Sequence, residues 1–422
     1  PSAALRTVAG ERMRILVISA AFPPMQAGEA DHTLHLCRHL AARELDVHLL
    51  TTRADLGAGL PFKVYPVIED WSWSDLPRLA LWLNRCSPDV VLLFYIGWIY
   101  NDHPMITFAP TVSKRLLPNA PFITQFANAI GAVPEQTSAV SRTIRKAVMM
   151  LAGARGSDYR FGTLLRDSDR VIVLSDLHRA TLAELFPGVN DKSVLIPPPP
   201  ILFICPEDNG AVRCKGRAAL GLSDEDFLIA YLGYVYPGKG VEILLKAVQT
   251  VSDERENVRL VVIGGSLQGF SSYAEGVYEL PDRMGIGDKV SWTGQYCWDS
   301  DKASTYLRAA DAFVLPIEIG VQMNNSSFAA AAAHGLPIIT TRGANLEQQF
   351  VHQENVFLCP PRDPEALASA IKLMMDAPDL RERLAAGALK LARDWFSWER
   401  AIDRTLTILH EGKRFDANTG HI

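Results

Sequence analysis

Four consecutive polar residues in the second half of the sequence are typical of a helix start that binds an anion. These residues are Asn324, Asn325, Ser326 and Ser327, and the alanines of 329–333 follow them. Short polar side chains bond the free N–H groups of a first helical turn, and alanine favours helix. Because these N–H groups and the helix dipole point the same way, the run predicts a phosphate site. An ordinary β-α-β unit is the alternative.

A glycine-rich loop about eighty residues earlier carries a lysine that could bind the same anion. The loop GYVYPGKG follows an apolar run and contains Gly233, Tyr234, Gly238 and Lys239. Glycines let the backbone approach a phosphate, and a lysine ammonium neutralises it. The spacing is not that of a Walker loop, because Val-Glu replaces the Ser or Thr that would follow. Together, the loop and the polar run predict a diphosphate clamp.

The first half of the chain offers polar residues where predicted strands end. Gly28 lies in the loop after the first apolar run, where the backbone turns sharply or comes close to a ligand, but the loop lacks the G-x-G-x-x-G of a dinucleotide site. Ligands of open α/β sheets bind at the carboxyl ends of the strands. The candidate pocket residues, with loop packing as the alternative, are Tyr95, Asn101, Asp102, His103, Gln125 and Asn128.

Three histidines have helical spacing near the start of the chain. His32, His35 and His39 fall at i, i+3 and i+7 of a helix predicted from about residue 31 to 43. This spacing puts them on one face. A metal site is conceivable there, but the chain has no H-E-x-x-H and no nearby pair of carboxylates. We therefore expect a partly exposed helix face and no metal site.

Alternating strands and helices predict an α/β fold with two doubly wound, Rossmann-like domains facing a cleft. Continuous apolar runs such as 14–20 and 227–232 are typical of central parallel strands. The prolines of 197–200 cannot lie in a helix or a central strand, so they mark a boundary. We predict an N-terminal domain at 13–200 and a C-terminal domain at 214–396. A final helix, 397–412, is expected to return to the first domain.

Composition excludes several functional classes. The 422 residues are 48% hydrophobic with a net charge of -5, which gives no nucleic-acid footprint. Six scattered cysteines without C-x-x-C pairs argue against a zinc site and suit a reducing cytoplasm. The strongly apolar run 90–100 is too short to span a bilayer. Residues 141–166 are basic and amphipathic, which indicates either a solvated helix pair or contact with anionic lipid at the inner membrane face.

Several motifs in order along the chain resemble one enzyme family. The opening RILVISAAFPPMQAGEADHTLHLCRHL, then SDRVIVLSDLHRATL, YLGYVYPGKGVEILLKAV and HGLPIITTRGANLEQQF are similar to the group 1 (family 4) glycosyltransferases of GT-B fold. The resemblance implies that a sugar is transferred from a nucleoside diphosphate sugar, with retention and without metal or cofactor. It implies a saccharide, glycolipid or small-molecule acceptor, as in polysaccharide biosynthesis. The first domain would bind the acceptor and the second the donor.

The resemblance also assigns roles to residues and shows where the chain departs from the family. Lys239 would hold the diphosphate, Gly28 would face the donor, Glu347 matches a family position, and the region 295–298 would lie near the base. Lys239, Gln125 and His103 are the expected catalytic residues. The departures are Tyr234 for an arginine, Gln322 and Ala330 for two paired glutamates, and Gln125 for an acceptor-side histidine. Glu318 would need a shifted loop to replace a missing glutamate.

The expected function is therefore a glycosyltransferase in which Lys239 and the residues 324–327 bear the diphosphate charge. Preorganised hydrogen-bond donors around the leaving phosphate can stabilise the charge that develops on it, so that no protein acid or base is needed. One alternative is a nucleotide-sugar epimerase of the same fold, which needs acidic residues placed for elimination. Another is a catalytically degenerate protein that acts as a binding or regulatory partner, which the four departures would explain.

Overall fold

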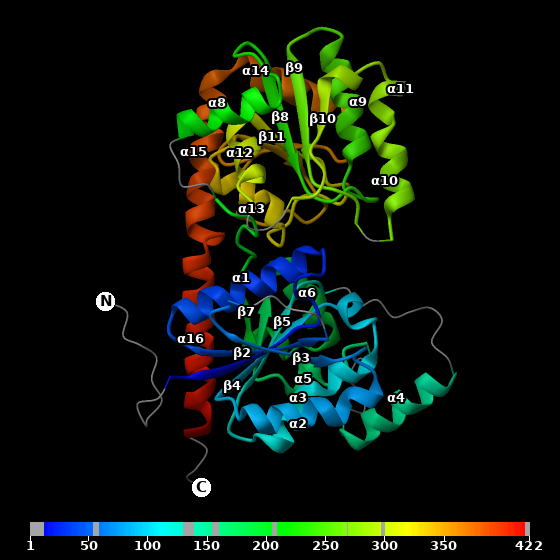
Figure 1. Cartoon of the computed structure of the whole chain (residues 1–422), viewed down its shortest axis with the longest axis vertical. Coiled ribbons are helices and arrows are strands. Elements are labelled where there is room, and N and C mark those ends of the chain that lie inside the picture. Colours follow the sequence, from blue (N-terminus) through cyan, green and yellow to red (C-terminus); the bar gives the residue numbers. More distant parts are fainter. Residues whose placement is uncertain are drawn as a thin grey trace. The chain divides into compact units, whose positions relative to one another are not determined.

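The chain consists of two compact units, each with its own sheet (Figure 1). The first unit contains Pro1–Pro197 and Trp398–Ile422, and the second contains Pro198–Ser397. The computed structural model describes residues 12–53, 59–129, 139–153, 160–204, 209–267, 269–296 and 300–417, with the backbone alone at 141, 209 and 410–417. Both sheets are parallel throughout, which confirms the predicted α/β class and the two doubly wound folds.

The sheet of the first unit has the strand order β3-β2-β1-β4-β5-β6-β7. The central strands are buried apolar runs, as predicted. Two edge strands were not predicted, because β3 is only partly buried and contains Pro66, and β7 has three residues. The strands are β1 Arg14–Ile18, β2 Asp46–Thr52, β3 Lys63–Ile68, β4 Val90–Tyr95, β5 Phe122–Phe126, β6 Arg170–Val173 and β7 Ser193–Leu195.

Helices cover both faces of this sheet, and the last helix of the chain, α16, packs against the first, α1 (Figure 1). An ion pair of 2.6 Å joins Arg43 to Asp403, and Arg404 donates to the Leu195 carbonyl at 2.9 Å. The helices are α1 Gly28–Ala42, α2 Leu76–Cys86, α3 Ala109–Leu116, α4 Ala139–Leu151, α5 Leu164–Asp167, α6 Asp176–Leu185, α7 Val189–Lys192 and α16 Trp398–Ala417, with 3-10 helices η1 Trp73–Asp75, η2 Gly97–Tyr100 and η3 Pro104–Phe108.

The sheet of the second unit has the strand order β10-β9-β8-β11-β12-β13. The strands are β8 Phe227–Leu232, β9 Val258–Ile263, β10 Val290–Trp292, β11 Ala312–Leu315, β12 Ile338–Thr341 and β13 Phe357–Cys359. The helices are α8 Asn209–Ala219, α9 Val241–Ser252, α10 Ser271–Tyr278, α11 Leu280–Arg283, α12 Lys302–Ala309, α13 Ser326–Ala333, α14 Pro364–Asp376 and α15 Pro378–Trp395, with the 3-10 helix η4 Gly287–Lys289. Of these strands, β13 was not predicted, because its short apolar run ends directly before two prolines.

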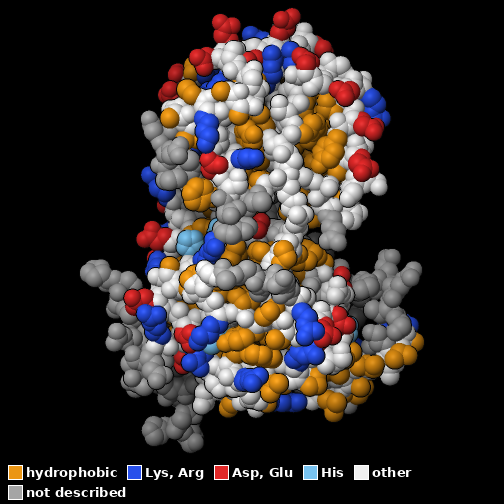
Figure 2. Space-filling view, in the orientation of Figure 1, with side chains coloured by type: hydrophobic (Ala, Val, Ile, Leu, Met, Phe, Trp, Pro, Cys, Tyr) orange, Lys and Arg blue, Asp and Glu red, His pale blue; other side chains and the backbone are white. Residues whose placement is uncertain are grey.

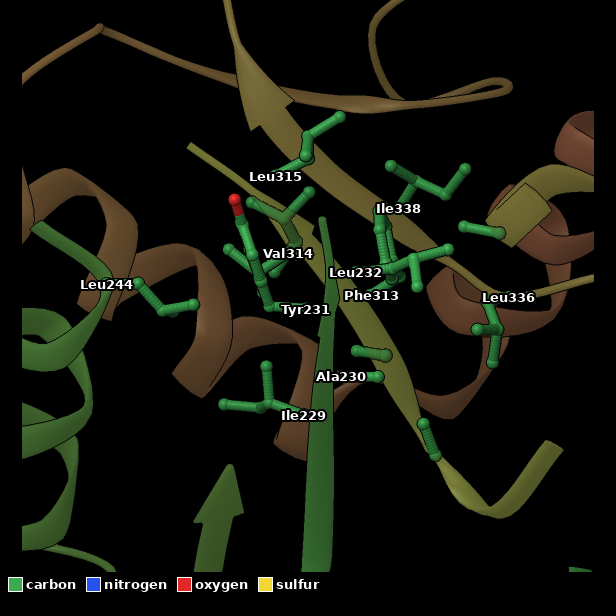
Figure 3. Close-up of a cluster of buried hydrophobic side chains, with 14 of the residues drawn as sticks. Ile229, Ala230, Tyr231, Leu232, Leu244, Phe313, Val314, Leu315, Leu336 and Ile338 are labelled. Atoms are coloured by element: carbon green, nitrogen blue, oxygen red, sulfur yellow. The ribbon is translucent and has the colours of Figure 1, made fainter. Parts of the chain in front are cut away.

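The core of the second unit lies on both sides of the adjacent strands β8 and β11 (Figure 3). Leu244 of α9 lies on one side of this pair and Leu336 on the other. Phe313 of β11 is fully buried, so its replacement by alanine would cost about 3–5 kcal/mol of stability. The strands β8, β9 and β10 follow one another toward one edge of this sheet, and β11, β12 and β13 follow one another toward the other edge. The strand order therefore reverses between β8 and β11. Ligands of such folds bind outside the carboxyl ends of the strands at this switch point.

Candidate functional site

The loop between β8 and α9 lies at the switch point of the second sheet and needs its glycines. Gly233 has a φ of 145°, and its N–H donates to the Ile263 carbonyl at 2.9 Å. Gly240 has a φ of 72°, and a Cβ atom there would lie 2.0 Å from the Pro316 carbonyl oxygen. Side chains rarely adopt such φ values, and Gly240 has no room for one. The glycines therefore fix a tight loop around Lys239.

The loop after β11 is bonded directly to the loop that carries Lys239. The Glu318 N–H donates to the Gly238 carbonyl at 3.0 Å. Lys239 is half-buried, and its Nζ atom lies 5.1 Å from the centre of the Tyr236 ring. Among the described residues, no carboxylate forms an ion pair with Lys239. A half-buried ammonium without a carboxylate at a ligand-binding edge is suited to an anionic ligand.

The helix start predicted at Asn324–Ser327 is present and lies beside the same loop. Asn325 is the N-cap of α13, and its Oδ1 atom accepts the Phe328 N–H at 2.9 Å. The Ser327 hydroxyl lies 3.5 Å from the position that a Cβ atom on Gly233 would take. The Lys239 loop and the helix start are therefore adjacent, although Gly233 and Ser327 are 94 residues apart in the sequence. Lys239 and the first turn of α13 together offer a cation and a helix dipole to one anion.

Glu347 holds the loop that leads into α13. Its carboxylate accepts the Met323 N–H at 2.6 Å, and the residue is only 5% exposed. Gly320, in the same loop, packs so closely on Gly343 that a Cβ atom would lie 2.1 Å from the Gly343 nitrogen. Half-buried Gln322 immediately precedes Met323. The structure therefore gives Glu347 a positioning role for the loop that contains Gln322.

Glu318, which could replace a missing glutamate only through a shifted loop, is paired elsewhere in the structure. Ala330 is 1% exposed within α13. The Glu318 carboxylate forms an ion pair of 2.7 Å with Arg362, so it is engaged with the loop before α14. Tyr234 stands where the family has arginine, and it is half-buried. Its backbone carbonyl accepts a hydrogen bond of 3.3 Å from the Tyr231 hydroxyl. Compared with the family pattern, this site therefore lacks both the arginine at position 234 and the two glutamates at positions 322 and 330.

The loops after β9 and β10 complete the same edge. The sequence predicted the region 295–298 after β10 but did not select Gly264 and Gly265 after β9. A Cβ atom on Gly264 would lie 2.2 Å from the Gly233 carbonyl oxygen, and one on Gly265 would lie 3.4 Å from Gln295. The sequence signal was a pair of glycines directly after an apolar run. Of the region predicted near the base, 295–298, only Gln295 and Tyr296 lie within the described residues.

In the first unit, Gln125 is joined to a histidine of α1. Its Nε2 atom lies 3.0 Å from the Nε2 atom of His32, and both side chains are buried. The His32 ring stacks on Phe94 of β4 at 5.2 Å between centres. Burial, followed by the charge of His35, lowers the pKa of His32 to about 4, so the ring is neutral at pH 7. Gln125 and His32 form a neutral polar pair near the ends of β4 and β5.

Tyr95 is the last residue of β4, and Asp102 and His103 lie in the segment that follows this strand. The His103 Nδ1 atom accepts the Met105 N–H at 3.2 Å, so the neutral ring carries its proton on Nε2. Burial is the main cause that lowers the pKa of His103. The Oδ1 atom of Asp102 is buried against Gly97, and burial raises the pKa of that carboxyl. In this tautomer His103 can donate a hydrogen bond to a substrate.

The other candidates of the first unit lie around these residues. Gly28 is half-buried and is the first residue of α1, whose N-cap, Ala27, has no side-chain hydrogen bond. Asn101 is exposed and donates to the Asp70 carbonyl at 3.3 Å. Asn128 is half-buried after β5. The structure thus places the first unit's candidates at the carboxyl ends of β1, β4 and β5.

The histidines of α1 lie around a tryptophan. His32 is buried, whereas His35 and His39 are partly exposed, so the predicted face is only partly open to solvent. The ring of Trp398, the first residue of α16, lies 5.6 Å from His32, 5.7 Å from His35 and 4.7 Å from His39. Burial lowers the pKa of all three histidines. No group of three or more His, Cys, Asp or Glu side chains within the described ranges is arranged to hold a metal ion. The shared face is a packing surface for α16.

Comparisons with known proteins link the chain to sugar-transferring enzymes. Residues 226–377 match the family described as glycosyl transferases group 1. The D-inositol 3-phosphate glycosyltransferase of Streptomyces griseus is 25% identical over 412 residues, which cover 92% of this chain and 79% of that protein. The sucrose-phosphate synthase of Thermosynechococcus elongatus has a TM-score of 0.70 at 19% identity, over 96% of this chain and 100% of that one. Anabaena Alr3699/HepE, solved in complex with UDP and glucose, has a TM-score of 0.69 at 16% identity, over 95% and 100%. The structural likeness extends over both sheets.

Proposed function

We propose that this chain, which belongs to the group 1 glycosyltransferases and has their GT-B fold, transfers a sugar from a nucleoside diphosphate donor to an acceptor hydroxyl. The observation that carries the proposal is the contact between the Lys239 loop and the start of α13. The Ser327 hydroxyl adjoins Gly233, and the Glu318 N–H bonds to the Gly238 carbonyl. One bound diphosphate would then meet both a cation and a helix dipole.

The donor's phosphates would be held mainly by Lys239 and the first turn of α13. This distribution follows from Tyr234, which supplies no second cation, and from Gln322 and Ala330, which supply no carboxylates. Because a cation and two carboxylates are lost together, the losses largely offset each other and leave the site with one negative charge fewer. Tyr236, Gln295 and Tyr296 are the described residues best placed for the remainder of the nucleotide, since they lie on the loops after β8 and β10. The complex of Anabaena Alr3699/HepE with UDP and glucose supports a nucleotide-sugar donor.

The proposed reaction proceeds with retention and uses no metal. In such a reaction the leaving phosphate accepts the proton of the acceptor hydroxyl, so a protein base is not needed. The protein stabilises the charge that develops on the leaving phosphate. Hydrogen-bond donors that are already fixed in place do this without reorganisation. Glu347 contributes indirectly, because it holds the loop from which α13 starts.

Acceptor binding is proposed for the first unit, at the carboxyl ends of β4 and β5. Gln125 and His103 are the residues proposed to contact the acceptor hydroxyls. The neutral His103 can donate from Nε2, and Gln125 is held by His32. We propose a saccharide, a lipid-linked sugar or a small polyol as acceptor and a cytoplasmic reaction. The name of the Streptomyces griseus relative, a D-inositol 3-phosphate glycosyltransferase, supports a hydroxyl-rich acceptor.

A donor panel tests this function. The purified protein is incubated with UDP-, GDP-, ADP- and dTDP-sugars and with saccharide, polyol and lipid-linked acceptors, with and without a chelator. Products are detected by mass spectrometry, and their anomeric configuration is determined by NMR. We expect turnover with at least one donor, with retention and in the presence of chelator. Release of an epimerised nucleotide sugar without acceptor, or no turnover with any pair, would contradict the proposal.

A further inference from the structure

Tyr236 and Lys239 are the first and last residues of one tight turn in the loop between β8 and α9. The Lys239 N–H donates to the Tyr236 carbonyl at 3.2 Å, and Gly238, the third residue of the turn, has a φ of 90°. A proline in the second place, here Pro237, and a glycine of positive φ in the third are the features of a type II turn. Because such a turn brings its first and last residues close together, the sequence Tyr-Pro-Gly-Lys places an aromatic ring beside the lysine.

The Lys239 ammonium lies over the face of the Tyr236 ring. Its Nζ atom is 5.1 Å from the ring centre, and cation–π contacts extend to about 6 Å. The negative face of the ring attracts the ammonium without neutralising it. A carboxylate in the same place would cancel the charge that binds a phosphate. The ring therefore fixes the position of the cation and leaves its charge for a ligand.

The Tyr236 ring is supported from α10. Phe270, the N-cap residue of that helix, lies 5.8 Å from Tyr236 between ring centres and is 39% exposed. Hydrophobic side chains reach the surface of the second unit over β10 and α10 (Figure 2), although no described helix is long and apolar enough to cross a membrane. Further along α10, the Tyr273 hydroxyl donates to the Glu242 carboxylate in the first turn of α9. This bond fastens α10 to the helix that follows the Lys239 loop, so Phe270 is held beside Tyr236.

A fixed position of the ammonium matters more here than in a site with two cations. A lysine side chain is long and flexible, and confining it when a ligand binds costs conformational entropy. Tyr234 stands where the family has an arginine, so Lys239 is the only cation in the loop GYVYPGKG. A lysine that is confined before the ligand arrives loses less entropy on binding.

We propose that Tyr236 is a positioning residue whose ring holds the Lys239 ammonium where the donor's diphosphate binds, and that Phe270 supports this ring. The inference rests on the proposed function, because that function assigns the diphosphate to Lys239. A direct contact between Tyr236 and the nucleotide is a separate contribution, and a double-mutant cycle distinguishes the two.

NMR of the free protein tests the contact between Tyr236 and Lys239 without any donor. The lysines are methylated reductively with isotope-labelled formaldehyde, which keeps their charge, and the Lys239 signal is assigned by its absence in Lys239→Arg. We expect a ring-current shift of this signal to high field that is kept in Tyr236→Phe and lost in Tyr236→Leu. A Lys239 signal at the same position in the wild type and in Tyr236→Leu overturns the inference.

Calorimetric titration with UDP, GDP, ADP and dTDP measures the effect on binding. For the nucleotide that binds the wild type most tightly, Tyr236→Leu should lower the affinity about fivefold, and Tyr236→Phe should stay close to the wild type. In the background of Lys239→Ala, Tyr236→Leu should cost about twofold or less, because no ammonium remains to be positioned. Phe270→Leu leaves the turn intact and should lower the affinity in the same direction, but less. Equal losses in both backgrounds, or tighter binding by Tyr236→Leu, overturn the inference.

The matched control is Tyr306→Leu on α12, a half-buried tyrosine of the same unit that should leave the Lys239 signal and the affinity unchanged. Thermal unfolding of every variant shows that folding is retained. If the wild type binds none of the nucleotides, the proposed function and the role of Tyr236 in it both fail, whereas the NMR signal still decides whether the ring holds Lys239. Binding with equal losses in both backgrounds leaves the function standing and removes only the positioning role.

Discussion

The Glu347 carboxylate accepts the backbone N–H of Met323 at 2.6 Å across 24 residues of sequence. Met323 is fully buried and lies two residues before the N-cap Asn325. This bond connects the segment after β12 to the loop after β11, and it fixes where α13 starts. A buried acidic side chain therefore positions the loop that leads into the proposed phosphate site.

Glu347→Ala is expected to destabilise the second unit and to weaken donor binding. The substitution leaves the buried Met323 N–H without an acceptor, which costs about 1–3 kcal/mol. Glu347→Gln keeps an oxygen acceptor and should lose less. Urea unfolding measures the stability, and calorimetric titration with donor measures the affinity. Donor affinity of the alanine variant equal to that of the wild type would show that Glu347 does not position the loop.

Gly233→Ala is expected to lower donor affinity about tenfold or more. At a φ of 145° an alanine is strained by roughly 1–3 kcal/mol, and its methyl group would lie against the Ser327 hydroxyl. Gly221→Ala is the control, because Gly221 also has a positive φ, 67°, but nothing lies within 4 Å of a Cβ atom there. Calorimetric titration compares the two. Equal donor affinities of Gly233→Ala and Gly221→Ala would show that Gly233 is not part of the donor site.

Acid is expected to unfold the first unit through His32 and His35. Burial, as the main cause, lowers the pKa of each to about 4 from 6.5, so the unfolded chain binds protons more tightly than the folded one. Stability therefore falls as the pH falls from 6.5 toward 4, with a slope approaching about 1.4 kcal/mol per pH unit for each histidine. The variant His35→Gln should show a shallower loss in urea unfolding between about pH 7 and about pH 5. An unchanged slope would exclude His35 as a cause.

Asp31 is expected to act in the opposite direction. Burial, together with the charge of Glu29, raises the pKa of Asp31 from 3.8 to about 7. The folded chain then holds this proton more tightly than the unfolded chain, so stability falls as the pH rises from about 4 to about 7. Asp31→Asn should stabilise the protein above pH 7 by up to roughly 4 kcal/mol. The gain should vanish below pH 4, and a gain that does not depend on pH would refute this origin.

The sequence predicted the parts of the fold that depend on local patterns. The buried runs at 15–18 and 227–232 are typical of central parallel strands, and Asn325 followed by alanines is a short-range helix signal. The strand β3 was missed, because its half-exposed residues and Pro66 do not give a continuous apolar run. The strand β13 was missed, because Phe357–Cys359 is a three-residue apolar run that ends directly before two prolines.

The sequence could not predict contacts that depend on topology. The spacing of His32, His35 and His39 placed them on one face, but only the fold shows that Trp398 covers it. The bond between Gln125 and His32 spans 93 residues, and its partners belong to different elements. Lys239 and the polar run 324–327 were paired from the sequence, whereas the role of Glu347 behind them needed the structure.

Calorimetric titration of nucleotide sugars into the wild type, Lys239→Ala and Lys246→Ala tests the central claim most directly. Lys246 is an exposed lysine of α9 in the same unit, so it controls for the loss of one charge. We predict that at least one UDP-, GDP-, ADP- or dTDP-sugar binds the wild type and Lys246→Ala alike. Its affinity for Lys239→Ala should be at least about tenfold lower, because removing a charged hydrogen-bond partner costs about 1.5–3 kcal/mol. Equal affinity for Lys239→Ala, or no binding of any of these donors to the wild type, would contradict the account.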